Sequence, residues 1–383
     1  MSKVYIVKCP DYSQTEPKLA ELITMMGGAG QFVKPDEKLA LKPNLLLAAD
    51  PEKAVTTHPS LVAAAGKLFG AIAQSVTVVE SPGAGYSYDT KTLEKTYQAC
   101  GIEEIAESSG IALNYDTSSE PVSFPQGKLI KRFEVISPIR RADCYINLCK
   151  LKSHGLMFMT GAVKNIFGAI PGRAKPGYHG TMTTRELFAG MLLDLAALLP
   201  PILTIMDAVV GMEGEGPGNG TPRRIGLLMA STDPLSLDIV ASAIMGIPED
   251  RNPLIVEAQK RGMHPSRLEE VEIIGASLDE LRIHDFKLPA TFTNENASRM
   301  MALFGFLGKT FFSVDPRIIK SKCVACGACK KTCPRSAIRI HAVAKIEKKR
   351  CIRCYCCHEM CKYQAIELHR GWGYRVANRK TGN

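Results

Sequence analysis

Hydrophobic residues in the first 285 positions fall into short runs separated by longer, helix-like stretches. The short runs, which are typical of buried strands, are KVYIVKC, KLALKPNLLL, SVTVVESP, ADCYINLCKL, PILTIMDAVVG, RIGLLMAS and VEIIG. The helix-like stretches lie between them, at 17–26, 59–73, 90–108, 183–199, 234–245 and 253–261. Strands that alternate with helices predict an α/β fold with a mostly parallel sheet and helices on both of its faces.

The most hydrophobic stretch, residues 187–206, is the best candidate for a membrane-spanning segment. It contains Asp194 and the pair Pro200–Pro201, so it indicates a buried helix, a break and then a strand. The first residues, MSKVYIVKC, pass directly into a strand-like run without a secretory or lipidation signal. We therefore expect a cytoplasmic protein without a membrane span.

The last part of the chain has a different pattern, dominated by cysteine. Nine of the thirteen cysteines lie between Cys323 and Cys361, and in the cytoplasm such thiols stay reduced instead of forming disulfides. Two runs share the spacing C-x2-C-x2-C-x3-C and start 28 residues apart, and similar segments follow them, PRSAIRI and KYQAIEL. The repeat indicates an internal duplication, each half being a cysteine loop, a short helical turn and a small strand.

This spacing is typical of two iron–sulfur cubanes, because in such a pair the last cysteine of each run binds the other cluster. We therefore predict two [4Fe-4S] clusters. The ligands of the first are Cys323, Cys326, Cys329 and Cys361, and those of the second are Cys333, Cys351, Cys354 and Cys357. Zinc is the alternative, since C-x2-C pairs also form structural zinc sites, but the doubled run of four favours clusters.

The segment from 317 to 370 resembles the bacterial-type ferredoxins that carry two [4Fe-4S] clusters, which implies a small α+β domain. Lys362 stands where these ferredoxins often have a second proline, so we expect a looser turn after Cys361. Cys356 is an additional thiol, interpreted as a small packing residue with substitute ligation as the alternative.

Charge is distributed as unevenly as cysteine. From Arg317 onward there are 17 lysines and arginines against three glutamates, a balance of +14, whereas the whole chain carries +10 and residues 1–316 therefore carry −4. A basic cluster domain predicts an acidic redox partner protein, with simple solvation of a small domain as the alternative. Positive surroundings also predict cluster potentials above those of acidic ferredoxins, because they stabilise the more negative reduced state.

Polar residues gather where several predicted strands end, which is where ligands bind in parallel α/β sheets. Lysines that lie among apolar residues indicate a shared anionic ligand, since an unpaired buried ammonium is costly. The candidate binding residues for a cofactor or small anion are Lys42, Asn44, His154, Lys164, Asn165 and Glu213. A mononuclear metal bound by His154 and His179 with Asp207 or Glu213 is a weaker alternative.

The glycine-rich stretch at 214–220 is interpreted as a flexible loop, with a phosphate cradle as the alternative. Its spacing is G-x-G-x-G-x-G and a strand follows it, so it does not match the dinucleotide-binding fingerprint. No Walker-type lysine motif and no flavin-binding motif is present, and a flavin is left as an open alternative without support from any motif.

At these same residues the chain resembles the domain-of-unknown-function family 362 (DUF362). The matching pieces are KPNLL, LCKLKSH, TGAVKNIFG, DAVVGMEGEGPGNGTP and STDPLSLDIVASAIMG, which together extend over most of residues 1–285. The resemblance implies an iron–sulfur protein with a shared N-terminal fold, and no settled reaction. The predicted domains are an α/β domain (1–285), a packed connector (286–316), a two-cluster ferredoxin domain (317–370) and a basic tail (371–383).

These features predict an iron–sulfur electron-transfer protein whose α/β domain binds a redox partner, a cofactor or a small anionic ligand. The alternative is a self-contained reductase whose α/β domain binds a small anionic substrate, so whether the protein is an enzyme stays open. A nucleic-acid-binding role for the basic tail has no aromatic-rich platform to support it, and we expect none.

Overall fold

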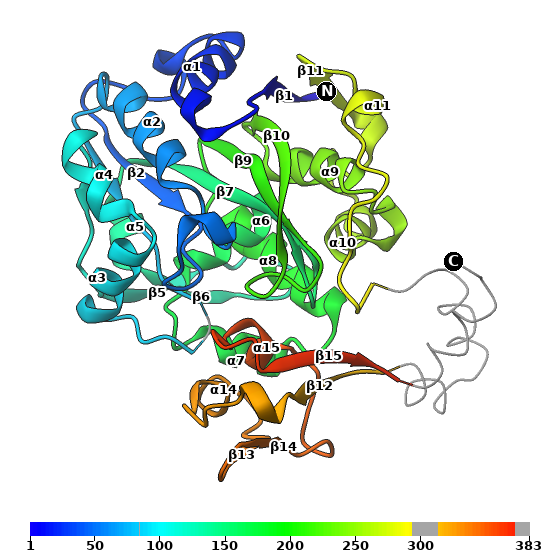
Figure 1. The fold of residues 1–383 in the computed structure, drawn as a ribbon. Helices are drawn as coiled ribbons and strands as arrows, with labels where there is room; N and C mark the ends of the chain where they lie inside the picture. The colour runs from blue at the N-terminus through cyan, green and yellow to red at the C-terminus, as the bar shows by residue number, and fades with distance from the viewer. Residues whose placement is uncertain (84, 293–312, 372–383) are drawn as a thin grey trace.

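The computed structural model describes residues 1–83, 85–292 and 313–371, and its centre is a nine-stranded sheet (Figure 1). The strands of this sheet are β1 (Ser2–Lys8), β2 (Lys38–Pro43), β3 (Ser75–Val78), β4 (Ala112–Leu113), β7 (Cys144–His154), β8 (Phe158–Thr160), β9 (Leu203–Glu213), β10 (Thr221–Ser231) and β11 (Val271–Ile274). Their order is β11-β1-β10-β9-β7-β2-β3-β4, and β8 pairs with β7.

The strands of one half of this sheet are parallel, as the sequence predicts. From β4 through β3, β2 and β7 to β9 every pairing is parallel, and β11 is parallel to β1. The exceptions are β10, which is antiparallel to β9 and β1, and β8, which folds back on β7. A tight hairpin can join only antiparallel neighbours, and the glycine-rich loop joins β9 to β10 in this way.

Helices cover both faces of the sheet, which confirms the predicted α/β architecture. One face carries α1 (Thr15–Met25), α2 (Pro59–Gly70), α3 (Thr90–Ala99) and α4 (Ile102–Ser108). The other carries α6 (Ala162–Asn165), α8 (Arg185–Leu198), α9 (Pro234–Ile244) and α10 (Pro253–Lys260). Side chains of β7 point to the two faces of the sheet and contribute to both apolar layers. Ile146 and Leu148 pack on the first set of helices, and Cys149 and Leu151 pack on the second.

Short elements complete the larger domain. They are the hairpin β5 (Ser119–Ser123) and β6 (Arg132–Ile136), with the helices α5 (Ser137–Arg141), α7 (Lys175–Thr181) and α11 (Leu278–Leu281).

The stretch at 187–206 is a buried helix, a break and a strand, as predicted from its prolines. Helix α8 ends before Pro200, and β9 begins after it. The carboxylate of Asp194 is satisfied inside the protein by Arg261 and by three backbone N–H groups. Across the described ranges, no helix has the length and hydrophobicity needed to cross a membrane.

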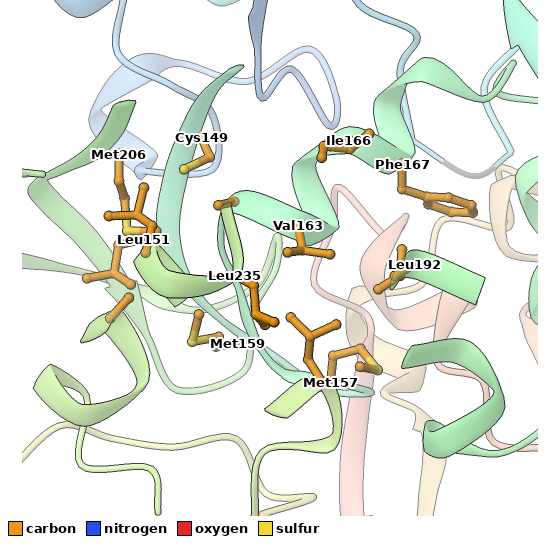
Figure 2. Packing of buried hydrophobic residues seen from close by; sticks show 14 of the residues in the cluster. Cys149, Leu151, Met157, Met159, Val163, Ile166, Phe167, Leu192, Met206 and Leu235 are labelled. Carbon is orange, nitrogen blue, oxygen red and sulfur yellow. The ribbon is translucent and has the colours of Figure 1, made fainter. Parts of the chain in front are cut away.

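The core beside α6 positions the polar ends of the neighbouring strands (Figure 2). Val163, Ile166 and Phe167 belong to the same apolar cluster as Cys149 and Leu151 of β7 and Leu192 of α8. The start of α6 is held by Asp238 of α9, whose carboxylate accepts hydrogen bonds from the N–H groups of Ala162 (2.6 Å) and Val163 (3.0 Å). Apolar packing and this buried cap fix the direction of the residues that follow.

The C-terminal segment forms a small α+β module. Its elements are β12 (Val314–Ile318) paired with β15 (Ile366–Arg370), β13 (Ile338–Ile340) paired with β14 (Ala344–Ile346), and the one-turn helices α14 (Ala328–Lys331) and α15 (Cys356–Glu359). Three pairs of left-handed residues recur at an offset of 28, namely 325 with 353, 327 with 355 and 336 with 364. The backbone therefore repeats the duplication seen in the cysteine spacing.

The expected looser turn after Cys361 is absent from this module. The N–H groups of Ser336 and Gln364 bond to the carbonyls of Cys333 and Cys361 at 3.1 and 2.9 Å, so both halves make the same turn. The left-handed residue closes the turn in each half, and proline is not needed for it.

The predicted connector lies mostly outside the described residues, as does the basic tail except for Gly371. At the described start of the connector, Phe286 is buried and Phe292 packs edge-on against Phe158, with ring centroids 5.0 Å apart.

Candidate functional site: a lysine-lined pocket against the cysteine module

A polar cavity lies where β2 and β7 end, beneath the cysteine module. Its empty volume is about 490 Å³, part of which is open to solvent. Its lining includes Asn44, Leu45, Leu46, Glu80, Ser81, Gly83, Lys152, Thr160, Lys164, Asn165, Phe167, Gly168, Lys175, His179, Pro217 and Glu359. We call this cavity the lysine pocket.

Lys42, from the end of β2, is fully buried and forms an ion pair behind the pocket. Its Nζ lies 2.8 Å from Oε2 of Glu80, which follows β3 and is also buried. The backbone of Gly168 passes so close to this pair that a Cβ there would lie 2.0 Å from the Glu80 carboxylate. The packing therefore requires glycine at this position.

A chain of amides joins the strand ends to α6. Lys152 donates to Oδ1 of Asn44 (2.8 Å) and to the Val55 carbonyl (2.6 Å), and Asn44 donates to Oδ1 of Asn165 (2.9 Å). Asn165 in turn donates to Oδ1 of Asn147 (2.8 Å). The Lys152 ammonium thus has hydrogen bonds to neutral oxygens, and no carboxylate of the described residues lies within salt-bridge distance of it. Burial lowers the pKa of Lys152 well below the usual value.

Lys175 has the same kind of environment on the opposite wall. It donates to the carbonyls of Ser81 and Pro82, both at 2.6 Å. Burial lowers the pKa of Lys175 to about 7.

Lys164 in α6 differs from Lys152 and Lys175 because it lacks even a neutral hydrogen-bond partner among the described residues. Within the part of the chain that the structure describes, it has no hydrogen bond and no ion pair. Burial lowers the pKa of Lys164, while the nearby Glu359 carboxylate acts in the opposite direction. Its ammonium is therefore available to a ligand.

Glu359 enters the pocket from the cysteine module and meets His154. Its Oε1 lies 3.2 Å from Nε2 of His154, but the pair lacks hydrogen-bond geometry and both atoms are without a partner in the described structure. Nδ1 of His154 accepts from the N–H groups of Leu156 (2.9 Å) and Met157 (3.2 Å), so Nε2 carries the ring proton. Burial raises the pKa of Glu359 and, together with Lys164, lowers that of His154.

The glycine-rich loop seats this part of the module. Asn219 donates to the carbonyl of His358 (2.6 Å), and Nε2 of His358 lies 3.1 Å from the carbonyl of Glu215. A Cβ on Gly216 would lie 2.1 Å from the Ser153 carbonyl, and one on Gly218 would lie 3.0 Å from that of Glu359. Close backbone approach on both sides explains these two glycines.

Five of the six predicted binding residues converge here, and the sixth does not. Lys42, Asn44, Lys164 and Asn165 line the pocket or its back wall, and His154 adjoins it through Glu359. Glu213 lies elsewhere, because its carboxylate pairs with Lys287 (3.6 Å) and Arg223 (3.7 Å).

The proposed mononuclear metal site is not assembled either. Asp207 pairs with Lys150 at 2.8 Å and accepts from Tyr12, away from His154 and His179. No group of three or more His, Cys, Asp or Glu residues that could hold one metal ion occurs in residues 1–83, 85–292 and 313–371.

Sequence reasoning missed three pocket residues: Glu80, Lys175 and Glu359. Glu80 ends the run SVTVVE, so its position at a strand end was an available signal. Lys175 lies in α7, which the hydrophobic pattern did not predict, and Glu359 is hidden among the cysteines of a different domain.

The eight predicted cluster cysteines surround two voids. One void is lined by Cys323, Cys326, Cys329 and Cys361. The other is lined by Cys333, Cys351, Cys354 and Cys357. Each void thus combines three cysteines of one run with the last cysteine of the other, and Cys356 lines neither.

The surroundings of these sulfurs fit thiolate ligands. Backbone N–H groups of Ala344, Ala337 and Ala365 donate to the Sγ atoms of Cys323 (3.3 Å), Cys333 (3.2 Å) and Cys361 (3.2 Å). Such hydrogen bonds stabilise negative charge on sulfur. Apart from cysteine, the first void is lined mainly by apolar residues, including Ile318, Val324 and Ile366.

Residues 39–243, more than half of the chain, match the family described as a domain of unknown function (DUF362), and residues 316–339 match a 4Fe-4S binding domain. The thylakoid-associated protein sll1697 of Synechocystis is 34% identical over 277 residues, which cover 71% of this chain and 82% of that protein. The chain therefore belongs to the DUF362 family and carries a C-terminal 4Fe-4S binding domain.

Two solved structures are weakly similar to this chain. Lactate racemase apoprotein from Thermoanaerobacterium thermosaccharolyticum has a TM-score of 0.42 at 11% identity over 64% of this chain. A protein from Thermotoga maritima has a TM-score of 0.37 at 12% identity over 60% of this chain. The chain spans 57% of the length of each.

Proposed function

We propose that this member of the DUF362 family is an iron–sulfur electron-transfer protein. Its C-terminal module carries two [4Fe-4S] clusters and lies against the lysine pocket, which binds a small anionic ligand. Each cluster, when bound, would take up and release one electron at a time. The eight cysteines around two voids support the number of clusters, and Lys164, which lacks a partner among the described residues, supports an anion.

The observation that carries this proposal is the composition of α15. This single helical turn contains Cys357, a predicted cluster ligand, and Glu359, which lines the lysine pocket. A cluster thiolate and the ligand site therefore lie only two positions apart along the chain. The approach is fixed because the glycine-rich loop holds α15 through Asn219 and His358.

The outer surface of the module supports exchange with an acidic redox partner protein. Between residues 317 and 370 the exposed charged residues are thirteen lysines and arginines and one glutamate, Glu367. Val324 and Tyr363, both exposed and both lining the first void, give this basic surface an apolar centre. Charge complementarity would steer an acidic protein to it. We propose no nucleic-acid partner, because no aromatic platform accompanies the basic residues.

A cytoplasmic location is part of the proposal. None of the thirteen cysteines, all of which lie in the described ranges, forms a disulfide, as expected in a reducing compartment. The Synechocystis relative is named as thylakoid-associated, so attachment to a membrane surface through a partner is compatible with this location.

The second candidate is a self-contained reductase, in which the pocket anion is a substrate. The contact between the module and the pocket favours it, because Glu359 lines the ligand site and its Oε1 lies 3.2 Å from Nε2 of His154. The reductase differs from the electron carrier in one respect. The reductase would convert and release the pocket anion as a substrate, whereas the carrier would retain it as a ligand.

Anaerobic purification followed by iron, acid-labile sulfide and small-molecule mass analysis tests the function. We expect about eight iron and eight sulfide per chain and spectroscopic reduction of the clusters without unfolding. Zinc without labile sulfide would overturn the proposal. Reoxidation by an acidic redox protein that weakens with salt supports the carrier, and stoichiometric conversion of a retained small molecule, or a bound flavin, supports the reductase.

A further inference from the structure

Polar atoms without hydrogen-bond partners are concentrated at the lysine pocket. Eight buried side-chain nitrogen or oxygen atoms of the described residues lack a partner, and five of them line or adjoin this pocket. They are Ser81 Oγ, His154 Nε2, Thr160 Oγ1, His179 Nδ1 and Glu359 Oε1. Burying such groups is costly unless a bound partner satisfies them. Their convergence indicates that a polar ligand completes the site.

The chemistry of these groups constrains that ligand. The hydroxyls of Ser81 and Thr160, the Nε2–H of His154 and the ammonium of Lys164 can all donate hydrogen bonds. Oε1 of Glu359 lies 3.2 Å from Nε2 of His154, the ring nitrogen that carries the proton, so this oxygen is assigned as an acceptor. The complementary ligand therefore offers several acceptor oxygens and one donor.

The charges around the pocket give the sign of the ligand. Glu80 offsets Lys42, whereas Lys152 and Lys175 are bonded to neutral oxygens and Lys164 has no partner in the described part of the chain. Glu359 is the remaining carboxylate of the lining. Three lysines, whose pKa values burial lowers, therefore face one carboxylate, and an anionic ligand would favour their charged forms.

We propose that the lysine pocket binds a tetrahedral oxyanion that retains a proton, of the inorganic phosphate type, with Glu359 accepting the hydrogen bond of its hydroxyl group. A simple carboxylate offers two acceptor oxygens and no donor, so it leaves Glu359 unsatisfied. Sulfate offers four oxygens but no proton, so its oxygen would face the Glu359 oxygen. The inference deepens the proposed function by naming the ligand class, and it rests on the docked module that supplies Glu359.

The test compares phosphate with sulfate on the anaerobically purified, cluster-loaded full-length protein. Titration calorimetry at mildly alkaline pH, where hydrogenphosphate still carries one proton, should give at least ~10-fold tighter binding of phosphate than of sulfate. The measured quantity is the ratio of the two affinities, because a general attraction to lysines would bind hydrogenphosphate and sulfate, two tetrahedral dianions, equally well.

Two substitutions examine the two halves of the site. Glu359→Gln should reduce the phosphate preference to within about 3-fold, because the amide can donate to sulfate. Glu367→Gln, the same change at an exposed position of the module, should leave the preference unchanged. Lys164→Gln should weaken both anions by ~10-fold or more, whereas Lys345→Gln, at an exposed lysine, should weaken neither.

Each outcome decides between distinct possibilities. Equal affinity for phosphate and sulfate in the unsubstituted protein would overturn the role of Glu359. If neither anion binds to protein with full iron and sulfide content, and neither anion changes its unfolding midpoint, the cavity holds only water. This result would overturn the inference and leave the electron-transfer function standing. Phosphate selectivity in protein that never acquires labile sulfide would sustain the inference and overturn the proposed function.

Discussion

The larger domain and the cysteine module satisfy their buried polar groups in different ways. In the larger domain, most buried charges find partners within the protein, such as Glu80 for Lys42 and Arg261 for Asp194, and two extensive apolar cores surround them. The module has a small apolar core that includes two of its own cysteines, Cys329 and Cys357. Its thiols surround voids and depend on an inorganic group to fill them.

The two regions therefore have different sources of stability. Apolar burial holds the larger domain whether or not a ligand is bound. The module resembles other small metal-dependent domains, in which binding free energy is folding free energy. Tests that separate the two regions follow, beginning with the largest effect.

Removal of one cluster ligand should disrupt the module and spare the larger domain. For Cys357→Ser we expect loss of about half or more of the iron and sulfide and rapid proteolysis within 317–370, because the cluster crosslinks the two halves of the duplication. Metal analysis and limited proteolysis with mass spectrometry measure both effects.

Cys356→Ser is the matched control, since Cys356 lines neither void, and its iron content should stay unchanged. Simultaneous unfolding of the larger domain in Cys357→Ser would contradict the separation of the two regions.

Breaking the buried ion pair should destabilise the larger domain strongly. Lys42→Met leaves the buried Glu80 carboxylate without its cation, which should lower the free energy of unfolding by about 3–5 kcal/mol. Urea unfolding followed by circular dichroism measures this change.

Lys67→Met removes an ion pair between two half-exposed side chains, Lys67 and Glu16, and should cost less than about 1 kcal/mol. A double variant, Lys42→Met with Glu80→Gln, should recover part of the loss. Equal effects of the two single substitutions would show that burial of the pair is unimportant.

Stability of the larger domain should rise with pH through Lys175. Burial lowers the pKa of this lysine from 10.5 to about 7, so between these values the unfolded chain holds a proton that the folded protein has released. The destabilising contribution is therefore fully present below about pH 7 and disappears as the pH approaches 10.5. The gain is on the order of 1–4 kcal/mol.

Unfolding free energies of the unsubstituted protein and Lys175→Met across this range measure the effect. The difference in unfolding free energy between the two proteins should be larger at neutral pH and become smaller as the pH rises. Parallel pH profiles would exclude Lys175 as the titrating group.

The smallest effect is expected at the basic surface of the module. Lys330→Gln with Lys331→Gln removes two exposed charges and should slow cluster reoxidation by an acidic redox protein several-fold at low salt, with less effect at high salt. Stopped-flow absorbance measures the rate. Lys91→Gln with Lys95→Gln, on exposed positions of α3, is the control pair, and an equal slowing there would show that net charge alone matters.

Much of the architecture could be predicted from the sequence. The alternating runs predict the α/β sheet, and Pro200–Pro201 predicts the break between α8 and β9. The polar strand ends correctly indicate Lys42 and Asn44 as neighbours of Lys164 and Asn165. Parallel strands force their carboxyl ends to one edge, so residues distant along the chain meet there.

Other parts of the site depend on tertiary contacts that carry no local pattern. Glu213 is the last residue of β9, and Lys42 lies near the end of β2, yet the carboxylate of Glu213 pairs with Lys287 and Arg223. Lys175 belongs to a short helix in a stretch without hydrophobic periodicity.

The sequence by itself determined the nature of the module, because three thiolates of each cubane come from one run at short, fixed spacings, and spacing is a property of the chain. It also determined the layered fold of the larger domain, since periodic burial requires periodic sequence. Only the tertiary structure decided that Glu359 of the module lies against Lys164 and His154 of the other domain. Docking depends on shape and hydrogen bonds across two separately formed surfaces, and no periodicity records where those surfaces meet.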